Sequence, residues 1–430
     1  MKIAEYISRL LVGSLFIVSG LIKANDPLGF SYKLQEYFSP EVLGMEWLGE
    51  YALPLAVFIC VAEILLGIAV VFGEKMIITS WALLMMIVFF TFLTFYSAYF
   101  NKVTDCGCFG DALHLTPWQS FSKDVVLLFF TLIIFVRRKE IQPNSSKEDA
   151  WLLPVSVLLI ALFSIGVIKW SFPVWFAVAV YGVLVVIKKF IGKSAARSWV
   201  MASIATVITT GFSLYCLANL PIKDFRPYRI GNNISELMKI PEGAQPDIYE
   251  TTLVYKNKKT GELVEYSQEE YMKQKVWENP DMEWVETKTK LIQKGYEPPI
   301  HDFEIIDADG NDITEDILNE PAILLVISYD ITHANESVQP KINKLAEEAF
   351  GKGIPVYGIT ASLNNEVETF KQKTGSNIDY FNADAITLKT IIRSNPGIVL
   401  LKNGTVAGKW HYNNIPETEE IQTLLKETKS

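Results

Sequence analysis

The sequence predicts an α-helical membrane bundle joined to a water-soluble α/β domain, and three observations lead to this fold class. Of the 430 residues, 50% are hydrophobic and only 20% are charged, and the mean hydropathy is +0.22. Residues 1–220 hold 16 Lys or Arg and 14 Asp or Glu, whereas residues 221–430 hold 23 and 34. The chain therefore divides into a nearly neutral apolar half and an acidic half of ordinary globular composition. Neither half has the basic face that nucleic-acid binding requires.

The apolar half contains about seven stretches of the roughly 20 residues that a helix needs to cross a membrane. Their centres lie near Leu15, Ala62, Val88, Phe129, Leu159, Gly182 and Thr209. The first stretch lacks a small-residue cleavage site before Lys23, so it is expected to remain in the protein as a helix. Membrane lipid is therefore an expected partner of residues 1–220.

Cationic loops set the expected orientation, because Lys and Arg are enriched on the cytoplasmic side. Residues 137–147 follow the fourth stretch and residues 188–197 separate the sixth from the seventh, and both segments are rich in Lys and Arg. Counting from them places the N-terminus in the cytoplasm and residues 221–430 on the outer side. Between the first two stretches, residues 27–51 are too polar to cross. They fit either an amphipathic helix on the membrane surface or a structured loop packed over the bundle.

The most informative string is Asp105-Cys106-Gly107-Cys108-Phe109-Gly110-Asp111, which follows the third stretch on the expected outer side. Two cysteines separated by one glycine can close a small strained disulfide, and strained disulfides are the more easily reduced ones. Cys106 and Cys108 are therefore candidate catalytic residues. The alternatives are a metal half-site and a pair of unreacting thiols, although two sulfurs and one nearby histidine do not complete a tetrahedral zinc site. That histidine, His114, is either a thiol base or an ordinary surface residue.

Glu63 is the carboxylate in the body of the second stretch, where an ionisable group is costly unless it is paired. Arg9, near the start of the first stretch, is its expected partner. Cys60 precedes Glu63 by three residues and so lies on roughly the same helix face. It is either a buried thiol beside the carboxylate or inert packing, and Cys216 is treated in the same way.

With these residues in hand, about 140 N-terminal positions resemble the DoxX family, in particular its MauE-type, redox-associated branch. The resemblance lies in the Cys106 string, in Arg9 with 11–13 and Phe16, in residues 19–23, and in Glu63 with Leu66-Gly67. It implies a four-helix bundle over 1–140 akin to the vitamin K epoxide reductase type, in a bacterial inner membrane. It also implies a thiol pair that exchanges electrons with a partner protein, with a quinone as the candidate second carrier.

This chain departs from that pattern in two respects. It adds about three further spans over 141–222, together with the outer half. It also lacks the second cysteine pair that relatives of the epoxide reductase type keep near the quinone. Cys106 and Cys108 then act alone, or with help from Cys60, or the electrons go elsewhere. The sequence therefore assigns no cofactor, and a quinone stays the candidate.

The outer half is expected to contain two parts. Residues 223–297 form a connecting subdomain with a hairpin, because residues 251–255 and 262–266 are strand-like and a turn at 257–261 separates them. Residues 298–430 alternate strand and helix, with strands at 303–307, 322–328, 356–360, 398–402 and 406–410. Helices are expected near 314–318, 338–351, 366–375 and 417–426. A parallel core with a terminal hairpin follows from this order.

Asn395-Pro396-Gly397 enters the strand at 398–402 in a way that resembles the proline-led strand of the thioredoxin fold. The position of that family's two-cysteine motif, after Ser328, holds no cysteine in this chain. A thioredoxin-like domain without thiols cannot exchange disulfides, but it can hold an extended peptide against the proline-led strand. Residues 395–397, with Pro396 expected to be cis, are therefore the predicted partner-binding surface.

Two classes of function follow. The first is an inner-membrane thiol-disulfide oxidoreductase that uses Cys106 and Cys108, with the outer domain docking a periplasmic or envelope protein. The second is a non-enzymatic, membrane-anchored assembly or binding subunit in which the cysteine pair only closes a loop. A transporter ranks third, because no inverted repeat is evident.

Overall fold

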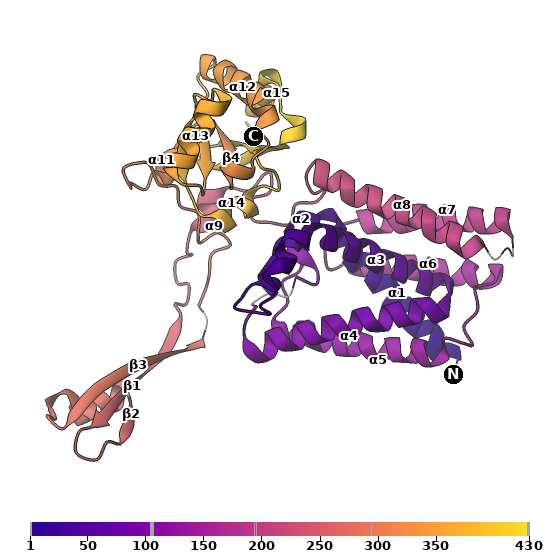
Figure 1. Ribbon diagram of the computed structural model, residues 1–430, viewed down its shortest axis with the longest axis horizontal. Helices are drawn as coiled ribbons and strands as arrows, with labels where there is room; N and C mark the ends of the chain where they lie inside the picture. The colour runs from indigo at the N-terminus through magenta and orange to yellow at the C-terminus, as the bar shows by residue number, and fades with distance from the viewer. Residues whose placement is uncertain (1, 104–106, 193, 195, 294, 428–430) are drawn as a thin grey trace.

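The computed structural model describes residues 2–103, 107–192, 194, 196–293 and 295–427. Seven long helices make up the first half, and they pack side by side (Figure 1). They are α1 (Lys2–Asn25), α3 (Ala52–Phe72), α4 (Met76–Phe100), α5 (Pro117–Arg137), α6 (Ser146–Ser164), α7 (Phe172–Ile191) and α8 (Arg197–Ala218). The predicted membrane bundle is confirmed.

Six of the seven helices are long and apolar enough to cross a membrane by length and composition, and α6 is the exception. Its first turn carries the charged residues Lys147, Glu148 and Asp149. The rest of its 19 residues form an uncharged stretch that is shorter than a typical membrane span. Helix α6 nevertheless packs beside α1 and α7 in the same bundle. At its start, the Tyr6 hydroxyl donates to Glu148 at 2.6 Å, and at its end the ring of Phe163 lies 5.3 Å from that of Phe109.

Seven passes place the two ends of the membrane half on opposite ends of the bundle. Tyr6 is near the start of α1, whereas Ala218 at the end of α8 accepts a hydrogen bond from Asn413 of the C-terminal domain. Figure 1 shows the N-terminus and the C-terminal domain at opposite ends of the helices. Among the described residues, six helices qualify as candidate spans by length and composition, so the odd number of passes stays a prediction that depends on α6.

Helix α1 is the central helix of the bundle, and 78% of the residues in its apolar stretch are buried. It crosses α3 at close range. A Cβ added to Gly13 would lie 2.6 Å from a methyl carbon of Val71, and one added to Gly67 would lie 2.7 Å from the Gly13 carbonyl oxygen. Small residues at such positions let two membrane helices approach closely, which increases their packing energy. The α1–α3 pair is thus the frame on which the other passes assemble.

A short helix, α2 (Pro27–Phe38), lies across the end of the bundle and is followed by the 3-10 turn η1 (Glu46–Tyr51). Asp26 caps it, since its carboxylate accepts from the Gly29 amide at 2.8 Å. Phe30 and Leu34 are buried toward the bundle, and α2 packs on α3. On its other side the Tyr32 hydroxyl donates to Tyr329 of the C-terminal domain at 3.2 Å. The segment packs over the bundle, as in the second sequence alternative, and it is also helical, as in the first.

The first part of the outer half is a three-stranded antiparallel sheet that projects away from both other parts (Figure 1). Its strands are β1 (Ile248–Asn257), β2 (Leu263–Ser267) and β3 (Met282–Gln293), in the order β2-β1-β3, and they are accompanied by α10 (Gln268–Gln274) and η3 (Val276–Glu278). Helix α9 (Ile234–Met238) precedes them in the chain and packs against the C-terminal domain. The predicted hairpin is confirmed. The third strand was not predicted, because almost all of its residues are exposed and its sequence therefore lacks a buried apolar face.

The last part is a five-stranded thioredoxin-like sheet in the order β6-β5-β4-β7-β8. Its elements are β4 (Ile323–Ser328), β5 (Val356–Thr360), β6 (Asp379–Asn382), β7 (Gly397–Lys402) and β8 (Thr405–His411), with helices α11 (Thr314–Asn319), α12 (Gln339–Gly351), α13 (Asn364–Thr374), α14 (Ala385–Ile391) and α15 (Thr418–Glu427). Strands β4, β5 and β6 are parallel, and β7 and β8 complete an antiparallel edge. Every residue of β4 is buried, because apolar clusters cover both faces of the sheet.

Two expectations for this domain were wrong in detail. Residues 303–307 form no strand, and Ile306 makes only isolated bridges to Asp312 and Asn382. Strand β6 and helix α14 were missed, because four residues at a sheet edge and seven residues of helix give too short a periodicity to recognise.

We predict that α6 crosses the membrane despite its charged start. Single cysteines at Lys139 and Val167, which flank α6 and are both exposed, should react with a membrane-impermeant maleimide from opposite sides. The measurement compares intact and permeabilised cells that express protein in which the four native cysteines are serine. Labelling of both positions from the same side would contradict the seventh pass.

Candidate functional site

The cysteine loop that follows α4 is pressed against α2. Gly107 has a φ of +66°, and a Cβ added to it would lie 3.2 Å from Cγ of Lys33 in α2. The Gly110 amide donates to the Gly107 carbonyl at 3.1 Å and leads into the 3-10 turn η2 (Gly110–Ala112). A side chain at position 107 would therefore strain the backbone and push the loop away from α2. Cys106 lies outside the described residues, so its bond with Cys108 remains a prediction.

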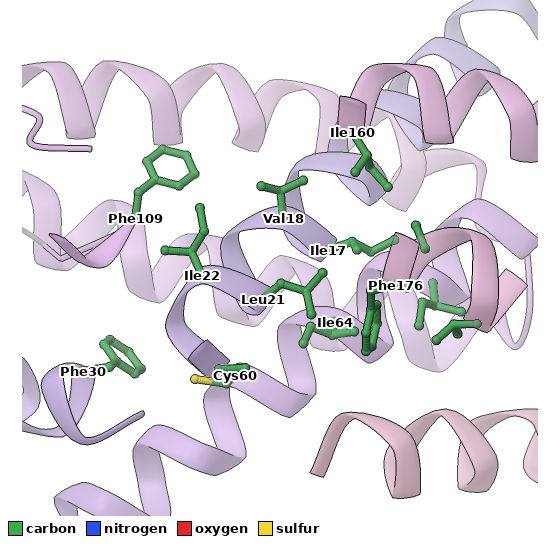
Figure 2. Packing of buried hydrophobic residues seen from close by; sticks show 14 of the residues in the cluster. Ile17, Val18, Leu21, Ile22, Phe30, Cys60, Ile64, Phe109, Ile160 and Phe176 are labelled. Atoms are coloured by element: carbon green, nitrogen blue, oxygen red, sulfur yellow. The ribbon is translucent and has the colours of Figure 1, made fainter. Parts of the chain in front are cut away.

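Cys108 is half-buried, and the bundle holds the residues around it. The Ser19 hydroxyl of α1 donates to the Cys108 carbonyl at 3.1 Å. Phe109 is only 3% exposed and inserts among the bundle helices, where it faces Ile22 and Val18 of α1 (Figure 2). Together these contacts fix Cys108 at the end of the bundle.

A buried ion pair lies beneath the loop. Lys23 of α1 places its ammonium nitrogen 2.6 Å from Oε1 of Glu63 in α3, and both side chains are 3% exposed. The same ammonium donates to Ser19 Oγ at 3.0 Å, and Ser19 Oγ lies 3.2 Å from Glu63 Oε2. Buried charges are stable in such a place only when they are paired and hydrogen bonded, and this network provides both.

The predicted partner of Glu63 was wrong, because Arg9 lies at the other end of α1. Its guanidinium donates to the carbonyls of Val70 and Val71 and to Asn144, and it lies 3.7 Å from Glu5. The two helices α1 and α3 are antiparallel, so the start of α1 meets the end of α3. Position 63 therefore faces the last turns of α1, where Lys23 stands.

A small cavity connects Cys108 with this ion pair. Its volume is about 20 Å³, and its walls include Ser19, Lys23, Glu63 and Cys108. One water molecule needs about 10–15 Å³ of such space and two or more polar partners, and this cavity meets both conditions.

A second polar pair lines the same cavity from α5. Lys123 and Asp124 are separated by 2.5 Å, and the Thr94 hydroxyl donates to the other oxygen of Asp124 at 3.0 Å. Sequence reasoning missed Ser19, Lys23, Lys123 and Asp124. The available signal was a Lys-Asp pair within an apolar span, and a Ser and a Lys spaced one helical turn apart.

The remaining cysteines lie in packing positions. Cys60 is fully buried in the main apolar cluster of the bundle, near Leu21 and Ile64 (Figure 2). Among the described residues, the walls of the cavity beside Cys108 include Glu63 and not Cys60. Cys216 is buried near the end of α8. The arrangement fits inert packing for both thiols.

On the opposite side of the loop, a larger cavity of about 490 Å³ separates the bundle from the thioredoxin-like domain. The loop contributes Gly107, Gly110, Asp111 and His114 to its wall, and His114 is exposed there. Cys108 and His114 thus line different cavities. The role of His114 as a thiol base remains a prediction.

Arg393, which follows α14, ties the C-terminal domain to the loop. Its guanidinium lies 2.8 Å from Asp26 Oδ2 and 3.2 Å from Asp111 Oδ2, and it sits over the Tyr32 ring. Burial raises the pKa of the Asp111 carboxyl, and the nearby Arg393 charge opposes that rise. Burial also tends to lower the pKa of Arg393, but Asp26 and Asp111 outweigh it, so the guanidinium stays charged.

The predicted partner-binding residues are next to this contact. The Asn395-Pro396 peptide bond is cis, as predicted. Pro396 and Gly397 are buried, and the Asn395 carbonyl accepts a hydrogen bond from the Asn335 amide at 3.1 Å. A segment of the same chain therefore already uses a backbone group that an added peptide strand would need. Peptide binding at residues 395–397 remains a prediction.

An apolar groove of about 650 Å³ runs between α1, α5 and α6. Leu15, Lys123 and Leu127 line both this groove and the small cavity beside Cys108. The remaining walls are almost entirely aliphatic or aromatic, and Phe163 closes the groove on the α6 side. Leu15, Lys123 and Leu127 thus stand between the groove and the cavity beside Cys108.

Comparisons with known proteins support the assignment of the N-terminal part as a membrane bundle. Residues 1–137 match the family model of methylamine utilisation protein MauE, and these residues contain Cys108, Lys23 and Glu63. The chain is also 27% identical over 150 residues to Protein TlpB of Flavobacterium psychrophilum, which covers 30% of this chain and 36% of that protein. The match thus spans about a third of the relative's own length. The MauE part of the sequence-based resemblance is confirmed for the first four passes, and the protein is a membrane protein.

We predict that Lys23 and Glu63 each need the other inside the bundle. Lys23→Met leaves a buried carboxylate without its cation, which should lower the free energy of unfolding by about 3–5 kcal/mol. Adding Glu63→Gln to that variant should restore much of the loss. Thermal or denaturant unfolding in detergent measures both effects.

The matched control is Lys33→Met, which removes the half-exposed Lys33–Glu36 pair of α2 at 2.9 Å. Its expected cost is below about 1 kcal/mol, because solvent screens such pairs. Equal losses for the Lys23 and Lys33 variants would show that the buried pair has no special role.

Proposed function

We propose that this protein is a thiol-disulfide oxidoreductase of a bacterial inner membrane, in which Cys106 and Cys108 cycle between dithiol and disulfide. The observation that carries the proposal is the position of Cys108. It lines a small cavity that it shares with the buried Lys23–Glu63 network, on a loop whose opposite side faces a large cavity, and Leu15, Lys123 and Leu127 of that small cavity also line an apolar groove. A loop closed only for stability would need neither the buried charges nor the two spaces.

The polar network supplies what thiol chemistry needs. A thiol must lose its proton to become a nucleophile, and Glu63 accepts that proton through a water in the cavity it shares with Cys108. Lys23 places its ammonium nitrogen 2.6 Å from Oε1 of Glu63, so its positive charge stabilises negative charge nearby. Ser19 holds the Cys108 carbonyl and thereby keeps the backbone in place.

The groove between α1, α5 and α6 is the proposed site of a quinone. Oxidation of the dithiol to the disulfide releases two electrons and two protons, and a quinone that takes up both becomes a quinol. The apolar walls suit an isoprenoid chain, and Lys123 stands where the groove meets the cavity beside Cys108. That position suits the polar head of the carrier.

The proposed orientation places the cysteine loop in the periplasm. The cationic segments around Arg138 and Lys188 lie at the same end of the bundle as the N-terminus, as the contact of Arg137 with Glu5 at 2.9 Å indicates. Such segments favour the cytoplasmic side. The loop and the outer half then face the compartment in which bacterial thiols are oxidised, where a periplasmic or envelope protein docks.

A second candidate function is a membrane-anchored assembly subunit. The projecting sheet favours it, since Trp277, Trp284 and Ile292 are all about half-exposed on an arm that contacts little else. No cysteine follows Cys216 in the sequence, so the outer half cannot itself perform disulfide exchange.

Thiol trapping in cells tests the redox proposal. Cys106→Ala or Cys108→Ala removes the resolving or the attacking thiol, so one of them should accumulate a mixed disulfide with another protein. Rapid acid quenching, alkylation and non-reducing electrophoresis detect it. Cys216→Ala is the matched control and should change nothing. If neither loop substitution changes the redox state of any partner, the assembly function is the better account.

The quinone site has its own test. Leu162→Trp fills the groove wall and should slow oxidation of the reduced protein by a short-chain ubiquinone analogue by about tenfold or more. Leu158→Trp, on the same helix and outside the groove, is the control with similar exposure. Equal oxidation rates in the two variants would place the electron acceptor elsewhere.

A further inference from the structure

The cavity between the bundle and the thioredoxin-like domain has the size and the enclosure of a binding site. Its volume of about 490 Å³ lies within the range of about 300–1,000 Å³ that is typical of ligand pockets. The end of α1 and helix α2 form one wall, the cysteine loop a second, and α14 with residues 221–226 a third. The site exists only because the two halves of the protein meet.

The carboxylates around this cavity are already neutralised by the protein. Each of the four has a cationic partner: Asp26 and Asp111 pair with Arg393, Glu36 with Lys33, and Asp224 with Arg226 and Lys409. Lys23, which also lines the cavity, is held by Glu63. Asp26 and Asp111 share the single charge of Arg393, whereas Asp224 has two cations, so the four carboxylates are balanced by four cations when the charges are summed over the cavity.

Two lysines remain. Across the described parts of the chain, neither Lys223 nor Lys389 has a carboxylate oxygen within 4.0 Å, and both are half-buried in the cavity wall. The Lys389 ammonium lies 5.0 Å from the centre of the Tyr32 ring and 5.7 Å from that of Tyr329, so aromatic faces hold it in place. The cavity therefore carries an excess of positive charge.

The rest of the wall is largely apolar. Phe30 comes from α2, Phe225 from the segment that leaves α8, and Ile386 from α14. An occupant of matching chemistry combines carboxylates for the two lysines with apolar side chains for these residues. An acidic segment of an extended polypeptide has both.

We propose that this cavity binds an acidic, cysteine-bearing segment of the partner protein and presents it to the cysteine loop. The inference rests on the proposed function and names the chemistry of its partner. Exchange needs no further reagent: a thiolate of one protein attacks a disulfide of the other, one sulfur-sulfur bond forms, one breaks, and a thiolate leaves. Over the complete reaction one dithiol loses two electrons and two protons, and one disulfide gains them.

The two other surfaces suit this role less well. At the proline-led strand, the Asn395 carbonyl is bonded to Asn335 and Pro396 is buried. The groove between α1, α5 and α6 is apolar throughout most of its length and faces the bilayer side of the bundle. Partner and lipid carrier thus approach the loop from opposite sides.

Peptides of known charge test the proposal on the full-length reduced protein in nanodiscs. Three decapeptides, one acidic, one neutral and one basic, each carry a cysteine activated as a 2-pyridyl disulfide. Attack by a protein thiolate forms the mixed disulfide and releases 2-thiopyridone, whose absorbance gives the rate. The acidic peptide should react about tenfold faster than the basic one at low salt, and the difference should shrink at high salt.

Charge-reversal variants assign this preference to the cavity. Lys223→Glu and Lys389→Glu should each slow the acidic peptide by about threefold to tenfold and speed the basic one. Lys341→Glu, an exposed lysine on α12 outside the cavity, should change neither rate. Because salt dependence is measured on the unmodified protein, a variant that fails to fold does not remove the test.

The outcomes separate this inference from the proposed function. Equal rates for the three peptides, or equal effects of the Lys341 and Lys389 variants, would overturn the cavity assignment while leaving thiol exchange intact. Loss of the acidic preference in phosphatidylglycerol nanodiscs, compared with phosphatidylcholine ones, would show that the lysines hold lipid headgroups instead. Failure of all three peptides to react with the protein would overturn the proposed function itself.

Discussion

The buried contact between Lys23 and Glu63 is the constraint on which the arrangement of this protein depends. Two charges inside a helical bundle are tolerable only if they meet, and they meet only because α1 and α3 are antiparallel and cross at close range over Gly13 and Gly67. The same contact places Ser19 under the cysteine loop, where its hydroxyl supports the Cys108 carbonyl. Stability of the bundle and geometry of the loop are therefore set by one network.

A second ionic contact joins the two halves of the chain. Arg393 reaches from the thioredoxin-like domain to Asp26, which caps α2, and to Asp111, which belongs to the loop. The Arg393 side chain is only 8% exposed. Separation of the domains would therefore leave its guanidinium and the carboxylates of Asp26 and Asp111 without these partners. The C-terminal domain thus contacts the cysteine loop and helps to hold it in place, although this domain contains no cysteine of its own.

The loop divides two environments. Its inner side meets a water-sized cavity, and its outer side meets a larger cavity whose wall includes Lys223 and Lys389. Seven helices place the C-terminal domain over that outer side, because an even number would put it at the other end of the bundle. Helix α6 contacts the bundle at both of its ends, through Glu148 with Tyr6 and through Phe163 with Phe109.

The sequence by itself determined the division into an apolar and an acidic half, the helical membrane bundle and most strands of the C-terminal domain. Each of these follows from local composition and periodicity. Only the tertiary structure decided that Lys23, and not Arg9, neutralises Glu63, because helix pairing fixes which turns face each other. It also decided that Arg393 meets Asp26 across 367 positions of sequence, and that Lys223 and Lys389 share a wall with the loop. Such contacts join residues with no local pattern in common, so no window along the chain could have contained them.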